Sequence, residues 1–199
     1  MGVYFDMITT YMKNKIIIGV VIALAVLGFW LLSSYNSMVR SNLAVDTQWA
    51  QVEAQYQRRF DLIPNLVGAV QGIFTQERDI FTAIANARQG YAGARTVDEK
   101  AEAAGRVESA LGRLLVITEN YPQLNSNQTV QNLMTQLEGT ENRISTERVR
   151  FNDAVSAFNA KVITFPGSLV ASIFGFAKRS FFEAQVGAET APKVEFNQQ

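Results

Sequence analysis

Residues 16–32 read IIIGVVIALAVLGFWLL and contain no charged side chain. A helix of this length rises about 26 Å, so with a turn at either end it covers the hydrocarbon core of a bilayer, which is about 30 Å thick. A buried core helix is the weaker interpretation because the segment is apolar on every face. A cleaved signal peptide is a further alternative, but no A-x-A site follows. We therefore predict an uncleaved transmembrane anchor over residues 16–35, after a flank over residues 1–15.

The charges beside the anchor bear on its orientation. Lys13 and Lys15 precede it, and Arg40 is the first basic residue after it. Because basic residues favour the cytoplasmic side, the N-terminus is expected in the cytoplasm and the following domain outside. This predicts a single-pass protein of a bacterial cytoplasmic (inner) membrane and favours a periplasmic domain over a cytoplasmic one.

Composition limits what the domain can do. The 199 residues carry 18 basic and 18 acidic side chains, so no basic excess points to nucleic acid. The chain has no Cys and no His, which argues against thiol or Ser–His nucleophiles, ordinary zinc sites and the Glu-x-x-His pairs of diiron bundles. We expect no catalytic residue, no metal site and no cofactor.

Residues 36–199 are predicted to form one all-α domain. A first helix over residues 33–88 carries apolar side chains at steps of three and four, and it continues from the anchor with a kink at Pro64. These side chains are Trp49, Val52, Tyr56, Phe60, Ile63, Val67, Val70, Phe74, Phe81 and Ile84.

Two further long helices follow from helix-start and helix-stop signals. Glycines in residues 89–95 end the first helix, and residues 96–99 (TVDE) form a capping box for the next one. Residues 125–127 (NSN) cap a third helix, which ends before Pro166. With a shorter helix at about residues 168–184, this predicts an antiparallel bundle of three long helices plus a short C-terminal one.

The segment over residues 165–177 has no charged side chain and is too short to span a bilayer. It is either a terminal helix that closes the bundle, an apolar surface for the membrane or a neighbouring subunit, or part of a second transmembrane element. The candidate membrane or oligomer contacts are Phe165, Leu169, Val170, Ile173, Phe174 and Phe176.

Several motifs together resemble the LemA family. Residues 57–67 read QRRFDLIPNLV and match the family's R-R-x-D-L-I-P-N-L-V signature. The match extends over residues 35–196, through the motifs SYNSMV (34–39), WAQV (49–52), ENYPQL (119–124), FPG (165–167) and APKVEF (191–196). The resemblance implies a bacterial helical bundle on an N-terminal membrane anchor. It implies no defined activity.

The signature contains a candidate polar cluster, made of Arg58, Arg59, Asp61, Pro64 and Asn65. The cluster is either structural, with Arg58 and Asp61 paired one turn apart, or a site for an anionic group. Glu77 and Arg148 also lie near the apolar stripes and are expected to approach one another.

Two functions fit these features. The first is a non-enzymatic, membrane-anchored structural or interaction protein that contacts lipid, self-associates as a homo-oligomer and has another membrane protein as a further partner. The second is an adaptor or ligand-binding module that recognises a partner protein or an anionic small molecule near Pro64. An enzyme is the third and weakest interpretation, because no second catalytic group accompanies any carboxylate.

Overall fold

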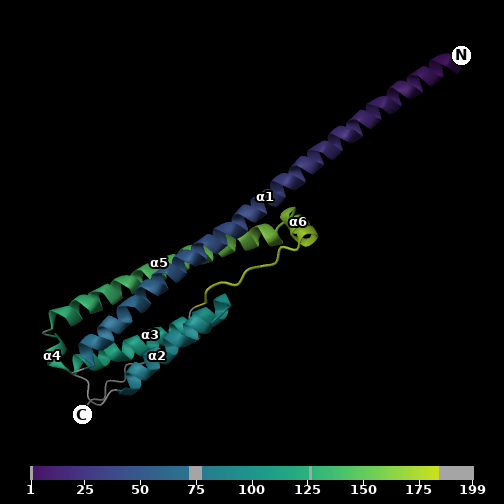
Figure 1. Cartoon of the computed structure of the whole chain (residues 1–199). Helices are drawn as coiled ribbons and strands as arrows, with labels where there is room; N and C mark the ends of the chain where they lie inside the picture. Colours follow the sequence, from purple (N-terminus) through teal and green to yellow (C-terminus); the bar gives the residue numbers. More distant parts are fainter. Residues whose placement is uncertain (1, 72–77, 126, 184–199) are drawn as a thin grey trace, which may run out of the picture. The chain divides into compact units, whose positions relative to one another are not determined.

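The computed structural model describes residues 2–71, 78–125 and 127–183, and in these ranges every regular element is an α-helix. In chain order the helices are α1 (Gly2–Val70), α2 (Arg78–Gly93), α3 (Val97–Glu119), α4 (Pro122–Asn125), α5 (Gln128–Ile163) and α6 (Gly167–Phe174) (Figure 1). The all-α prediction is confirmed.

Helix α1 contains both the apolar segment and the start of the folded domain. It continues through Pro64 without ending. Within the part of the chain that the structure describes, α1 is the one single helix long and apolar enough to cross a membrane. Large apolar side chains of the anchor such as Leu24 and Val26 are 62% and 64% exposed, as expected for groups that face lipid.

The predicted first helix is wrong at its far end. We expected it to reach Arg88, but α1 ends at Val70 and a separate helix, α2, begins at Arg78. Val70 and Ile84 are both buried, so the apolar spacing continues across two helices and hides the break between them. Phe74 and Glu77 lie outside the described residues.

The predicted caps of α3 and α5 are confirmed. Thr96 Oγ1 accepts from the Glu99 N–H at 3.1 Å, and a Glu99 carboxylate oxygen accepts from the Thr96 N–H at 3.2 Å. At the start of α5, Asn127 Oδ1 accepts from the N–H groups of Thr129 and Val130 at 3.0 and 3.3 Å. Each cap satisfies backbone donors that the helix itself leaves free.

Helix α6 is shorter than predicted. We expected it to extend to about residue 184, but it ends at Phe174 because Gly175 adopts a left-handed conformation with φ of 74°. The chain then continues without regular structure to Glu183. In that segment Phe182 is buried, and its backbone exchanges two hydrogen bonds with the side chain of Asn152, at 2.8 and 3.0 Å.

The chain forms two compact units. The first contains α1 up to Ala44 together with Ala157–Lys178. Its core consists of Met38, Val170 and Ala171, with Trp30, Tyr35, Val162 and Phe176 packed against them. Helix α6 therefore packs against the part of α1 that directly follows the anchor.

The second unit contains Val45–Ser156 and the described residues from Arg179 onward. Here α1 and α5 are antiparallel, since Trp49 contacts Phe151 and Tyr56 contacts Arg148, whereas Arg59 contacts Thr140. Helices α2 and α3 pack beside α1, since the ring of Tyr91 contacts that of Tyr56 and Lys100 pairs with Glu53 (Figure 1). The core contains residues predicted from the stripes, among them Val52, Phe60, Ile63, Val107, Leu114, Ile144 and Val155.

Candidate functional site

A buried arginine is the most unusual polar feature of the second unit. The side chain of Arg59 is 2% exposed, although it carries a charge. Its Nε donates to Thr140 Oγ1 at 3.2 Å, and its Nη2 pairs with the Glu141 carboxylate on α5. Its Nη1 lies 3.8 Å from Glu108 Oε1 on α3 and has no hydrogen bond. Arg59 thus links α1 to two other helices.

A second charged group adjoins the first. Arg148 of α5 pairs with the Glu108 carboxylate and donates to the Tyr56 hydroxyl, which in turn donates to Glu108 at 3.3 Å. Burial raises the pKa of the Tyr56 hydroxyl well above its usual range, although the positive charge of Arg148 acts in the opposite direction. The Tyr56 hydroxyl thus stays protonated, accepting a hydrogen bond from Arg148 and donating one to Glu108. Glu77, the expected partner of Arg148, lies outside the described residues.

The structure separates the candidate polar cluster into two parts. Arg59 faces the core, whereas Arg58, Asp61, Pro64 and Asn65 are exposed. The Asp61 carboxylate accepts a hydrogen bond from Gln57 Nε2 at 2.8 Å. Arg59 lies three residues after Tyr56 and four before Ile63, so it falls on the apolar stripe of α1. That spacing is the sequence signal for its burial.

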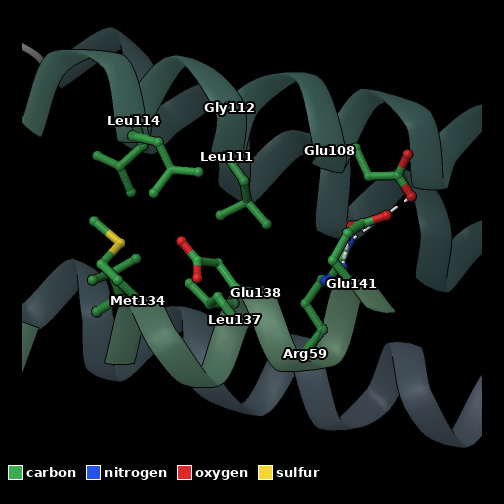
Figure 2. A pocket seen from close by; sticks show the side chains of 11 residues that line it. Arg59, Glu108, Leu111, Gly112, Leu114, Met134, Leu137, Glu138 and Glu141 are labelled. Carbon is green, nitrogen blue, oxygen red and sulfur yellow. Dashed lines mark hydrogen bonds and ion pairs between the residues drawn. The ribbon is translucent and has the colours of Figure 1, made fainter. Parts of the chain in front are cut away.

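A small cavity lies beside Arg59, between α1, α3 and α5. Its volume is about 170 Å³, below the range of about 300–1,000 Å³ typical of small-molecule pockets. Figure 2 shows Met134, Leu137 and Glu138 of α5 facing Leu111 and Leu114 of α3, with Arg59 reaching toward Glu108 and Glu141 at one end.

The residues that line this cavity do not favour a bound anion or a metal ion. Three carboxylates line it, those of Glu108, Glu138 and Glu141, against the one guanidinium of Arg59. A free anion would meet net negative charge there, which costs free energy in a partly buried site. Among the described side chains, no group of three or more Asp, Glu, His or Cys residues is placed to hold a metal ion.

The apolar segment presents a second candidate surface, in the first unit. Phe165, Leu169, Ile173 and Phe174 are exposed at 80, 54, 66 and 46%. Of the other two predicted contacts, Val170 is buried in the core and Phe176 is half-buried against it. Four of the six residues predicted for a membrane or oligomer contact are thus on the surface. The exposed four, Phe165, Leu169, Ile173 and Phe174, are called the α6 surface below.

The family resemblance is supported by comparison with known proteins. A family model described as the LemA family matches residues 48–196. Two Paramagnetospirillum magneticum proteins named magnetosome protein MamQ 1 and MamQ 2 are 28% identical to this chain over 186 residues, which is 80% of this chain and 68% of theirs. Magnetosome protein MamQ of Magnetospirillum gryphiswaldense matches with the same identity and coverage.

Proposed function

Since the chain belongs to the LemA family, we propose that it is a non-enzymatic, membrane-anchored structural protein that self-associates into a homo-oligomeric assembly. The family membership and the apolar helix support a membrane-associated protein. Self-association, the absence of an enzymatic activity and the side of the membrane are the further steps of the proposal.

The spacing of small residues in the anchor supports self-association. Within the anchor, a Cβ placed on Gly19 meets nothing within 4 Å, so the fold of a single chain gives this glycine no packing role. Ala23 lies one turn further along the same face, in a small-x-x-x-small pattern. In membranes this pattern lets two helix backbones approach closely, and van der Waals contact then holds them together. The proposed occupant of this face is a second copy of α1.

Detergent-extracted protein tests the assembly. On mass photometry the full-length chain is expected to run as an oligomer, and a clean monomer in every detergent would contradict self-association. Gly19→Leu should shift the distribution toward monomer because the larger side chain keeps the backbones apart. Gly28→Leu is the matched control: Gly28 also meets nothing within 4 Å, and nine residues of helix place it about half a turn away. Equal loss of the oligomer in both variants would argue against contact between copies at the Gly19 face.

The proposed side of the membrane rests on Lys13 and Lys15 before the anchor and Arg40 after it. The chain has no Cys, so Ser109→Cys gives one reporter thiol on an exposed position of the second unit. A membrane-impermeant maleimide should label this thiol in cells whose outer membrane has been permeabilised while the inner membrane is intact. Labelling only after the inner membrane is opened would place the domain in the cytoplasm.

Recognition of a partner protein or anion near Pro64 is the second candidate function. Arg58 and Asn65 are both exposed and lie seven residues apart, about two turns, so they share a face of α1 with Asp61. A binding role predicts that Arg58→Ala weakens capture of a partner from native membranes while the thermal melt is unchanged. Unchanged capture would remove this candidate.

A further inference from the structure

The α6 surface is apolar and lies beside the anchor in the first unit. Leu169 and Ile173 are one turn apart, so they form one exposed face of α6, and the opposite side of the helix buries Val170 and Ala171 in the core. Val170 and Ala171 therefore fix the helix in place, and Leu169 and Ile173 face away from that core.

The position of α6 along α1 determines its depth in a membrane. Residues 16–35 of the anchor cover the hydrocarbon core, about 30 Å at about 1.5 Å per residue. Helix α6 packs on Tyr35, whose ring lies 4.7 Å from that of Phe174, and on Met38. Met38 is three residues beyond Tyr35, so it rises about 4.5 Å above the hydrocarbon boundary. The headgroup region on each side is about 5–8 Å thick, which places α6 within it.

The side chains around α6 suit that depth. Tyr35, at the hydrocarbon boundary, is a partly exposed aromatic residue, of the kind that gathers at membrane–water boundaries. The sequence has no acidic residue between Asp153 and Glu183, whereas Lys161 and Lys178 are exposed on the described chain. Exposed apolar groups next to basic ones and away from acidic ones favour the surface of an anionic bilayer over water.

From these observations we infer that α6 is an interfacial helix, which inserts Phe165, Leu169, Ile173 and Phe174 among the lipids next to the anchor. The α6 surface thus binds the lipid interface, whereas contact between copies is assigned to the Gly19 face of α1. This inference rests on the membrane-anchored function proposed above, and it adds a second lipid contact at the far end of the folded chain.

A close backbone contact between Gly167 and Lys161 in the first unit fixes the start of α6. A Cβ on Gly167 would lie 2.3 Å from the Lys161 carbonyl oxygen, so only glycine fits where α6 begins. Lys161 Nζ also donates to the Ser37 hydroxyl at 3.1 Å, which ties the end of α5 to the same stretch of α1. Both contacts keep α6 at the level of residues 35–38.

Spin-label accessibility tests the inference on the full-length protein in vesicles of phosphatidylethanolamine and phosphatidylglycerol. The native chain has no Cys, so Leu169→Cys and Ile173→Cys each carry one nitroxide. Leu24→Cys in the anchor gives the lipid reference, and Ser109→Cys gives the water reference. Ser172→Cys probes the same exposed stretch without removing an apolar side chain, in case the first two variants fold poorly.

We expect labels at 169, 172 and 173 to be relaxed by oxygen more than by a water-soluble nickel chelate, as at Leu24→Cys. Preference for nickel, as at Ser109→Cys, would overturn the inference. Exclusion of both reagents would also overturn the inference. If the spectra then show spin–spin broadening that is removed by adding unlabelled protein, a second copy covers α6. If the spectra show no such broadening, α6 is packed within its own chain. If the protein is oligomeric and the α6 labels prefer nickel, only the interfacial helix is contradicted. If the protein is monomeric and the α6 labels prefer oxygen, only self-association is contradicted.

Discussion

At the scale of single residues, the two neighbouring arginines of the signature have different roles. Arg59 is buried and ion-paired, whereas Arg58 is exposed. Sequence alone shows that the two are polar and near a proline, and it leaves both a structural and a binding role open. The spacing from Tyr56 to Arg59 to Ile63 separates them, because it places only Arg59 on the core-facing stripe. What sequence cannot supply are the partners, Glu108 and Glu141, which come from helices far along the chain.

The different burial of Arg59 and Arg58 predicts a large loss of stability for one alanine variant and a small change for the other. Arg59→Ala leaves the partly buried Glu108 without one of its cations and should lower the free energy of unfolding by about 3–5 kcal/mol. Arg58→Ala removes an exposed side chain and should change it by less than about 0.5 kcal/mol. Urea unfolding followed by circular dichroism in detergent micelles measures both. Similar values for the two variants would show that Arg59 is not a structural ion-pair residue.

At the scale of elements, the starts of α3 and α5 were predictable, whereas the start of α2 and the ends of α1 and α6 were not. The capping box of α3 and the Asn127 cap of α5 depend on contacts within a few residues, so the local sequence predicts them. The end of α1 and the end of α6 were missed because the apolar pattern continues past them. Gly175 was the available signal for α6, since its left-handed backbone ends the helix.

The capping box predicts a pH dependence. Backbone N–H groups of Arg95 and Thr96 donate to the Glu99 carboxylate and lower its pKa. A lowered folded-state pKa gives stability that is present above the unfolded-state pKa and lost as pH falls through the folded one. Wild type should therefore melt above Glu99→Gln at neutral pH, and the difference in melting temperature should close in acid. A difference that does not change with pH would contradict this role of the charge.

Alanine substitutions of two glycines should have opposite effects on stability, one at the turn between α5 and α6 and the other within α5. Gly167→Ala places a methyl group against the Lys161 carbonyl and should destabilise the first unit by about 1–3 kcal/mol. Gly139→Ala, in the middle of α5 with nothing within 4 Å, should instead stabilise by about 0.5–1 kcal/mol. Tryptic cleavage at Lys161 is expected to accelerate in the first variant only. Unchanged cleavage in Gly167→Ala would mean that the turn can relax around the methyl group.

At the scale of the whole molecule, we propose two lipid contacts for this LemA-family protein, the anchor of α1 and the α6 surface, and one contact between copies, at Gly19. Sequence predicts the anchor and the helical domain because both depend on composition and spacing. Sequence left the apolar segment at 165–177 open between core and surface. The structure assigns Val170 to the core and Leu169 and Ile173 to the surface, because that division depends on which face of α6 meets Met38.

Energy transfer between copies in a bilayer tests the central claim, self-association, most directly. Ser109→Cys protein is labelled with donor or acceptor, mixed, and reconstituted in vesicles at increasing lipid dilution. Transfer is predicted to persist at dilutions where randomly distributed monomers give none, and to fall toward the random value with Gly19→Leu in the same background. Transfer at the random value at every dilution in the Ser109→Cys protein would contradict self-association.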